Sequence, residues 1–293
     1  MEQTAFERAQ ALLTELAQAA EQGTIVPARL PGQFKAIQDL LAQAADERQA
    51  SGSTGDLPAD MDAFRKQEAV FFGHAIHELR TPMTSIRGYS DMLNNAAMGA
   101  LNDMQKQFVD TIRTNSRRME TLLTDVSDMN KLRAGTLRVN TKMDMFKNIA
   151  MMVEKAMTPL AESLGKTLAF DIPQGLPILD IDGELLAKAI SKLVENGLRY
   201  TRENGVVTVR AKAQDKYLII EIIDNGIGMS ADELNRLGEV YYRSDKDAVR
   251  AHKGSGLGVP VAYGIIHLLG GSVSAQSEPD KGTTLTITLT GKS

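Results

Sequence analysis

The chain has 293 residues, of which 43% are hydrophobic and 24% are charged, and this composition is typical of a globular protein with one large domain or two ordinary ones. Its formal net charge of −4 gives no reason to expect nucleic acid or an anionic membrane as a partner. The chain has no cysteine, which excludes disulfides, thiol catalysis and cysteine-ligated metals and fits a reducing compartment.

Targeting segments give no strong signal. The first residues, "MEQTAFERAQ", lack the basic and then apolar order of a signal peptide. A stretch without acidic or basic residues, 254–277, is rich in glycine, which predicts a buried helix with glycine-rich flanks and not a membrane span. We therefore expect a cytoplasmic chain without a membrane span.

The N-terminal third begins with two helical patterns, over 4–22 and 33–49, joined by a connector with prolines and glycines. Residues 51–59 include "SGSTGDLP", which has the composition of a linker. The next pattern is stronger. Apolar residues recur with helical spacing over about 60–95 and again over about 102–133, with "NNAAMGALN" between them. These segments predict two antiparallel helices of a hairpin.

Each helix of this hairpin carries an apolar stripe that two helices alone cannot bury. Pairing with the hairpin of a second copy makes a four-helix bundle, so the pattern over 60–136 predicts a homodimer.

The residue pattern changes after "RAGTLRVN". Helical patterns at 144–164 and 184–199 alternate with β-rich runs, separated by the turn signals "RENG" and "PDKG". The runs are "TLAFDI", "GVVTVRAK", "YLIIEIID", "GSVSAQS" and "GTTLTITLT". Their alternation predicts an antiparallel sheet with helices on one side, an α/β sandwich over about 140–293. The fold class is thus multidomain, a dimeric all-α hairpin followed by this sandwich.

The segment "HELRTP", 77–82, places reactive side chains within one and a half turns of the first hairpin helix. The helical angle predicts that His77 and Thr81 face solvent one turn apart. Pro82 removes an intrahelical hydrogen bond, and we expect a bend there. An exposed histidine beside Glu78 and a bendable joint suits a substrate that another domain must reach, although a surface histidine on a coiled coil is the ordinary alternative.

Three further motifs lie in the sandwich. "LIIEIIDNGIGMS", 218–230, leads a strand into a D-x-G-x-G turn, whose aspartate can accept a hydrogen bond from an amino group such as that of adenine. "KGSGLG", 253–258, opens a helix, where backbone N–H groups favour phosphate. "SKLVENGLRYT", 191–201, offers an asparagine oxygen to a hard cation such as Mg²⁺ and an arginine to phosphate. Each has an ordinary structural explanation when taken alone.

Together, in this order and spacing, the motifs resemble the sensor histidine kinases of two-component systems. The resemblance covers roughly residues 60–293. It implies a dimerisation and histidine phosphotransfer domain over 60–136, followed by an ATP-binding domain of the GHKL class over 140–293. It also implies autophosphorylation with ATP and Mg²⁺, transfer to an aspartate of a response regulator receiver domain, and phosphatase activity toward that regulator.

The resemblance assigns roles in the hairpin. His77 is the phosphoacceptor, and Glu78 is its general base or orienting partner. Thr81 occupies the place where the family positions a water for dephosphorylating the response regulator.

The resemblance also assigns roles in the sandwich. Asn196 is the Mg²⁺ ligand with Glu195 beside it, and Arg199 and Tyr200 contact phosphate and nucleotide. Asp224 contacts adenine. The glycines are those that shape the adenine pocket, Gly226 and Gly228, and those of the lid and phosphate loop, Gly254, Gly256 and Gly258. "GEVYYRS", 238–244, is similar to the aromatic segment before the lid, and "GTTLTI", 282–287, to the closing strand.

Some residues depart from the family pattern. Lys192 stands where an earlier asparagine is usual, Gly197 replaces the common alanine, and Tyr241 and Tyr242 replace phenylalanines. Lys192 and Gly197 put the rate and the nucleotide affinity in question.

Two other classes are considered. A GHKL ATPase of the chaperone, mismatch-repair or gyrase type shares the nucleotide motifs but not the HELRTP hairpin. A non-catalytic dimeric scaffold that binds a response regulator does not need His77, Asn196, Asp224 and the glycine loop. For residues 1–50 the pattern resembles a degenerate HAMP-type linker, with ordinary helical packing as the alternative.

Overall fold

The structure is a computed structural model that describes residues 59–95, 99–252 and 254–291, with a few isolated positions before them. Side chains are described at residue 73 and from residue 75 onward within these ranges. The predicted N-terminal segment 1–50 and linker 51–59 lie almost entirely outside the described residues, so the HAMP-type prediction stays untested. The chain divides into two compact units between Glu120 and Thr121.

The first unit contains helix α3 (Ala59–Leu93) and most of helix α4 (Asp103–Arg133), as the apolar spacing predicted. The N-terminus of α4 is closed by two reciprocal bonds between Asn102 and Gln105, in which each backbone N–H donates to the other side chain at 3.0 and 2.9 Å. The helix α3 continues through Pro82 without interruption. The bend expected at that proline stays a prediction.

Two ion pairs join the helices of the hairpin. Arg113 donates to Asp91 at 2.7 Å, and Arg87 donates to Glu120 at 2.9 Å. The later residue of α3 pairs with the earlier residue of α4, which confirms the antiparallel arrangement. The hydrogen bond from Arg113 holds the pKa of Asp91 below its ordinary value.

The second unit is the α/β sandwich, together with the last turns of α4. Its elements in chain order are β1 (Lys142–Met145), α5 (Phe146–Ser163), β2 (Thr167–Asp171), β3 (Ile178–Ile181), α6 (Gly183–Tyr200), β4 (Val206–Gln214), β5 (Tyr217–Asp224), α7 (Ala231–Asn235), α8 (Asp247–Arg250), α9 (Gly258–Leu268), β6 (Ser272–Glu278) and β7 (Gly282–Thr290).

Five of these strands form one sheet in the order β2-β4-β5-β7-β6, and β1 pairs with β3 in a separate two-stranded sheet. Most neighbours in the large sheet are antiparallel, as predicted, but β2 and β4 are parallel. The chain between β2 and β4 passes through α6, which supplies the long crossover that a parallel pair requires.

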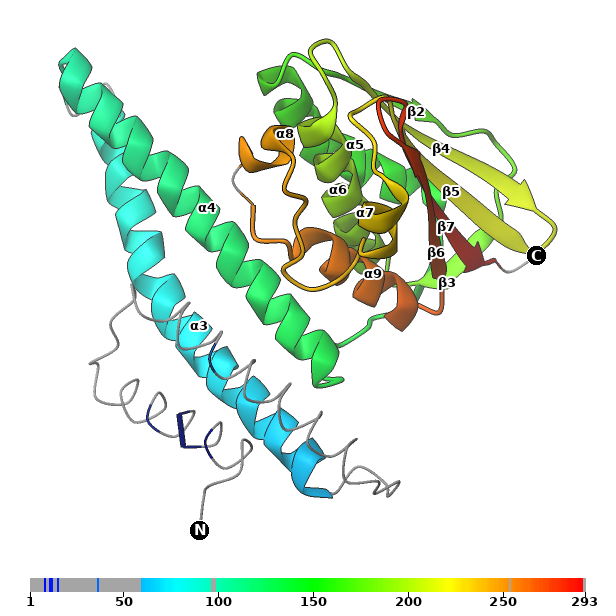
Figure 1. The fold of residues 1–293 in the computed structure, drawn as a ribbon, viewed down its shortest axis with the longest axis horizontal. Coiled ribbons are helices and arrows are strands. Elements are labelled where there is room, and N and C mark those ends of the chain that lie inside the picture. The colour runs from blue at the N-terminus through cyan, green and yellow to red at the C-terminus, as the bar shows by residue number, and fades with distance from the viewer. Residues whose placement is uncertain are drawn as a thin grey trace. The chain divides into compact units, whose positions relative to one another are not determined.

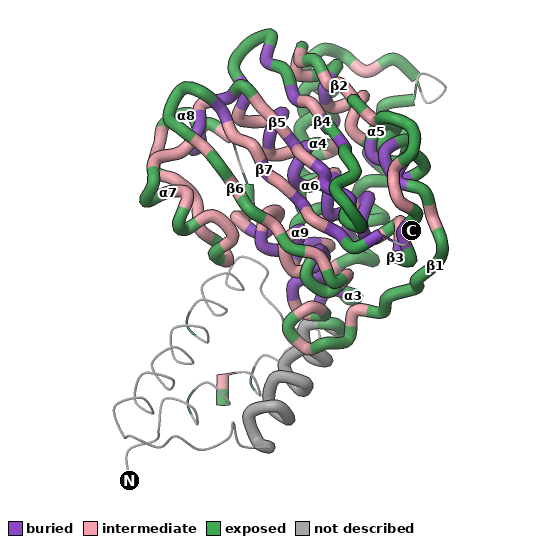
Figure 2. The backbone as a smooth tube through the Cα atoms, turned by 90° about the vertical axis from the view of Figure 1, so that its right-hand side faces the viewer, coloured by how far each residue is buried: buried purple, intermediate pink, exposed green. Residues whose placement is uncertain are grey.

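Helices α5, α6 and α9 cover one face of the large sheet (Figure 1). The buried residues are concentrated in the central strands of the sheet and in the helices that cover it (Figure 2). Ile190 of α6, Ile220 of β5 and Ile265 of α9 are fully buried in this core. Many of the alternate residues are polar or charged, as in the threonines of β7 and the ion pair of 2.6 Å between Lys212 of β4 and Glu221 of β5. This alternation explains why helices cover only one face.

Within the described residues, no helix has the length and apolar character needed to cross a bilayer. The charge-free stretch 254–277 contains the buried helix α9, as the sequence predicted.

Candidate functional site

The hairpin presents His77 and Glu78 to solvent, and each side chain is 76% exposed. The Nδ1 atom of His77 lies 3.7 Å from Oε1 of Glu78, which is close for an ion pair but longer than a hydrogen bond. Thr81 is also exposed, while Ala75, Ile76 and Met83 are buried. The predicted outward direction of His77 and Thr81 is thus confirmed, whereas their chemical roles are not tested by this geometry.

Helix α6 carries the predicted metal and phosphate residues and is fixed at both ends. At its start, Asp182 accepts a hydrogen bond from the N–H of Leu185 at 3.0 Å. At its end, Nζ of Lys166 donates to the carbonyl oxygens of Leu198 at 2.5 Å and Thr201 at 2.6 Å. The negative end of the dipole of α6 stabilises a cation at this position. Burial lowers the pKa of Lys166.

Asn196, Arg199 and Tyr200 are half-buried near that fixed end of α6. The guanidinium of Arg199 donates twice to Oε1 of Glu195, at 2.9 and 2.7 Å. Arg199 is therefore already held by a carboxylate on its own helix. A phosphate group that binds here must compete with Glu195 for this cation.

Asp224 ends strand β5 and is held by the neighbouring backbone. Its Oδ1 accepts hydrogen bonds from the N–H of Gly226 at 2.9 Å and from the N–H of Thr283 at 3.2 Å. Burial raises the pKa of Asp224, and these two donors oppose that rise. Because both donors use Oδ1, the carboxylate is oriented without involving Oδ2 in either bond.

The two glycines after Asp224 are required by close contacts. A Cβ on Gly226 would lie 2.5 Å from the carbonyl oxygen of Tyr200, the residue that ends α6. Gly228 has a φ of +59°, and a Cβ there would overlap the carbonyl oxygen of Glu278. The N–H of Ile227 donates to the carbonyl of Tyr200 at 3.1 Å. The D-x-G-x-G turn and the end of α6 are thus in direct contact.

The glycine-rich segment 254–258 lies against the segment that carries the two tyrosines. The N–H of Tyr241 donates to the carbonyl of Gly256 at 3.1 Å, and a Cβ on Gly254 would lie 2.5 Å from Nη1 of Arg243. Gly258 begins helix α9, as predicted. The ring of His252 meets Tyr200 edge to face, with the ring centroids 5.7 Å apart.

His252 sits among cations. Burial lowers its pKa first, and the nearby charges of Lys166, Arg199 and Arg243 lower it further. This concentration of positive charge beside Tyr200 suits a polyphosphate.

The departures at Lys192 and Gly197 have local explanations. Lys192 forms an ion pair with Asp125 of α4, and Lys188 forms another with Asp128 at 2.6 Å. Burial raises the pKa of Asp125 against the opposing effect of Lys192. Gly197 does not interrupt α6, and a Cβ there would lie 3.3 Å from Val207. Gly197 is therefore closely packed against β4, and an alanine here would need a small shift of Val207.

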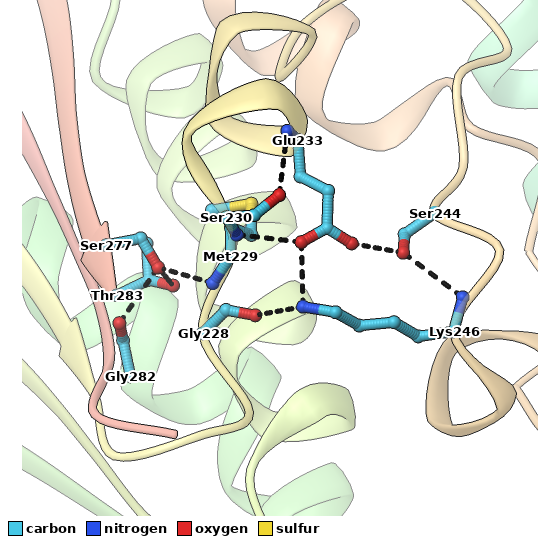
Figure 3. A network of polar contacts seen from close by, with 9 residues as sticks. All are labelled: Gly228, Met229, Ser230, Glu233, Ser244, Lys246, Ser277, Gly282 and Thr283. Carbon is cyan, nitrogen blue, oxygen red and sulfur yellow. Dashed lines mark hydrogen bonds and ion pairs between the residues drawn. The ribbon is translucent and has the colours of Figure 1, made fainter. Parts of the chain in front are cut away.

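The sequence analysis missed a polar network that joins the D-x-G-x-G turn to the segment before α8 (Figure 3). Its centre is Glu233 on α7, which contacts Ser230, Ser244 and Lys246. Ser230 and Glu233 form a capping box, and the sequence "SADE" carries that signal. The contacts to Ser244 and Lys246 join residues more than ten positions apart and have no local signal.

Two protein-family models match the chain. Residues 67–135 match the His Kinase A (phospho-acceptor) domain, which contains His77. Residues 181–292 match the histidine kinase-, DNA gyrase B- and HSP90-like ATPase domain, which contains α6, the Asp224 turn and the glycine-rich segment.

Two curated relatives align with most of this chain. The histidine protein kinase DivJ of Caulobacter vibrioides is 28% identical over 250 residues, which are 85% of this chain and 42% of DivJ. The sensor histidine kinase WalK of Bacillus subtilis is 26% identical over 232 residues, which are 78% of this chain and 37% of WalK. The chain thus spans less than half the length of these two relatives.

Solved structures agree on the fold. A crystal structure of full-length ShkA in complex with AMPPNP matches with a TM-score of 0.64 and 23% identity, over 76% of this chain and 46% of that one. The two matched models together describe a phospho-acceptor hairpin followed by an ATPase-type sandwich. The chain is thus similar to the sensor histidine kinases, the family that its motifs resemble.

Proposed function

We propose that this chain transfers the γ-phosphoryl group of ATP to His77 and then to an aspartate of a response regulator receiver domain. The observation that carries the proposal is the contact between the Asp224 turn and the end of α6, which brings an adenine-type acceptor and phosphate-type donors into one site. Because the reaction consumes ATP, we expect it to occur in the cytoplasm.

In this proposal the sandwich binds both the adenine base and the phosphates of the nucleotide. Oδ2 of Asp224 accepts a hydrogen bond from the adenine amino group, since its other oxygen is oriented by Gly226 and Thr283. Gly226 and Gly228 let the backbone approach the flat ring. Tyr200 lies between this turn and His252, so it contacts the nucleotide near the sugar and phosphates.

The phosphates lie toward Asn196, Arg199 and the segment of Gly254, Gly256 and Gly258. Asn196 offers an amide oxygen, a hard ligand that fits Mg²⁺, which usually keeps several waters and phosphate oxygens as its other ligands. When bound, Mg²⁺ would neutralise charge on the phosphates. Arg199 exchanges Glu195 for phosphate, and the N–H groups at the start of α9 favour the same anion.

In the hairpin, Glu78 accepts a hydrogen bond from the Nδ1–H of His77 after a small side-chain movement, because the two groups already lie 3.7 Å apart. That bond fixes the tautomer in which Nε2 carries the lone pair and attacks phosphorus. Thr81 positions a water for hydrolysis of the regulator's aspartyl phosphate. A second copy of the chain completes the bundle around the exposed apolar side chains of α3 and α4.

The test is incubation of the purified protein with ATP labelled on the γ-phosphate. A histidine kinase retains acid-labile, base-stable label on the protein. An ATPase of the GHKL class releases labelled phosphate without retaining it, and a scaffold does neither. The account predicts retained acid-labile label, and release without retention contradicts it.

A further inference from the structure

A single carboxylate organises the network shown in Figure 3. Oε2 of Glu233 accepts the N–H of Ser230 at 2.8 Å and the ammonium of Lys246 at 2.7 Å, while Oε1 accepts the hydroxyl of Ser244. The side chain of Glu233 is 13% exposed. Both oxygens are therefore occupied in a largely buried place, where a hydrogen-bonded ion pair is strong.

Lys246 links this carboxylate to the D-x-G-x-G turn. Its Nζ also donates to the carbonyl of Gly228 at 3.2 Å, and its own N–H donates to Ser244 at 3.2 Å. Lys246 directly precedes helix α8 in the segment between the tyrosines and the glycine-rich loop. One ammonium group thus joins that segment to the last glycine of the turn.

The three consecutive residues 228–230 are held by side chains from other elements. Lys246 holds the carbonyl of Gly228, Ser277 of β6 accepts the N–H of Met229 at 2.9 Å, and Glu233 accepts the N–H of Ser230. Two of these three contacts come from the Glu233–Lys246 pair. The left-handed conformation at Gly228 leaves the turn without regular structure of its own, so these contacts determine where it lies.

We propose that Lys246, through its ion pair with Glu233, is a positioning residue that holds the D-x-G-x-G turn and the segment before α8 in one arrangement before nucleotide binds. This inference rests on the proposed nucleotide site. Lys246 touches no substrate in this account; it lowers the cost of ordering two loops on binding, which is preorganisation.

The carboxyl group of Glu233 is ionised at the pH of any ordinary assay. Burial alone would raise the pKa of Glu233, but hydrogen bonds from Lys246, Ser244 and Ser230 lower it to about 2. The effect of Lys246 on nucleotide affinity is therefore expected to stay constant between about pH 6 and 8.

The experiment compares Lys246→Met with Lys246→Arg and with a matched control, Arg250→Met. Arg250 lies in α8, directly after the same segment, and pairs with Asp245 at 2.8 Å. The side chains of Arg250 and Asp245 are 65% and 95% exposed. Calorimetric titration of the full chain with ADP and Mg²⁺ gives the affinity. We expect Lys246→Met to weaken binding about tenfold, Lys246→Arg to recover most of that loss, and Arg250→Met to change it less than about twofold.

Amide hydrogen exchange of the nucleotide-free protein supplies a second readout. Lys246→Met should increase exchange at residues 226–230 and 244–250 while the thermal midpoint changes little. If Lys246→Met does not fold, Glu233→Gln replaces it and should weaken binding several-fold.

The possible failures differ. Wild-type protein that does not bind ADP overturns the proposed nucleotide site and with it this inference. Wild-type binding together with unchanged affinity in Lys246→Met, or with an equal loss in Arg250→Met, overturns the positioning role alone.

Discussion

The hairpin and the sandwich differ in how much of their apolar surface the chain itself covers. In the sandwich, large side chains from both helices and strands are fully buried, among them Phe146, Leu193 and Ile220. In the described hairpin as far as Glu120, the buried apolar residues are Ala75, Ile76, Met83 and Val109. Larger apolar residues of the same hairpin are exposed, namely Ile86, Tyr89, Met92, Leu93, Met104, Phe108, Ile112 and Met119.

This difference indicates two ways of reaching stability. The sandwich completes its core within one chain. Full burial of a fully exposed large apolar side chain contributes about 1.5–3 kcal/mol, and each of these partly exposed side chains would gain part of that amount. Pairing with a second copy would supply this burial. The comparison thus separates a sandwich that buries its core within one chain from a hairpin that leaves a large part of its apolar side chains exposed.

The largest effect is expected on the nucleotide affinity of the sandwich. Asn196→Ala should weaken nucleotide binding about tenfold or more with Mg²⁺ present and much less without it. Asp224→Asn should weaken binding of ADP in both conditions, because it acts at the base. Calorimetric titration with and without Mg²⁺ measures both effects, with Asn148→Ala, an exposed asparagine on α5, as the control. If the two variants lost the same affinity both with and without Mg²⁺, Asn196 and Asp224 would not have separate roles.

The next effect is expected on the association of two hairpins. Ile112→Asp places a charge on the exposed apolar face of α4 and should raise the dimer dissociation constant at least about tenfold. Light scattering over a range of protein concentrations measures this constant. Met151→Asp is the control, since Met151 is also apolar and exposed, at 57% against 43% for Ile112, but belongs to α5 of the sandwich. An equal effect of both substitutions would contradict the proposed interface.

A third change tests the ion pair between Lys192 of α6 and Asp125 in the last turns of α4, both in the second unit. Lys192→Met leaves Asp125 buried without its ion pair and should cost about 3 kcal/mol in the free energy of unfolding of the sandwich. Lys188→Met should cost less, because Lys188 is 35% exposed.

A denaturation cycle that includes Asp125→Asn/Lys192→Met isolates the coupling between the two residues. Additive losses would show that the last turns of α4 are not tied to α6 through this pair.

The smallest effect on the kinase reaction is expected at Thr81. Its hydroxyl carries no charge and cannot neutralise a transferring phosphoryl group, so Thr81→Ala should keep autophosphorylation within several-fold of wild type. Dephosphorylation of the phosphorylated regulator should slow strongly, as measured by the regulator's half-life. Thr84→Ala is the control, since its hydroxyl is committed to the carbonyl of Arg80 at 2.9 Å. Equal half-lives with both variants would leave Thr81 without a phosphatase role.

Long periodic segments were the most predictable part of the fold. The pattern over 102–133 predicted α4 to within one residue at its start, because the apolar spacing persists over many turns. The four-residue strands β1 and β3 and the short helices α7 and α8 were missed, since each is too short to show a period. The parallel pairing of β2 with β4 depends on a crossover that alternation alone does not reveal.

The candidate site was predictable where motifs carry the chemistry. His77 and Thr81 are exposed as predicted, and Asp224, Gly226 and Tyr200 come together as expected of one site. Partners distant in sequence were not predictable. Lys192 looked like an unexplained departure because its partner Asp125 lies 67 positions away.

The central claim is that His77 on the hairpin receives phosphate from nucleotide bound to the sandwich. The direct measurement is retention of label from γ-labelled ATP by wild-type protein and by His77→Gln, with ADP affinity measured in parallel. We predict that His77→Gln retains no acid-labile label while binding ADP within a few-fold of wild type, because His77 lies outside the unit that contains the proposed nucleotide site. Acid-labile label retained by His77→Gln would contradict the assignment.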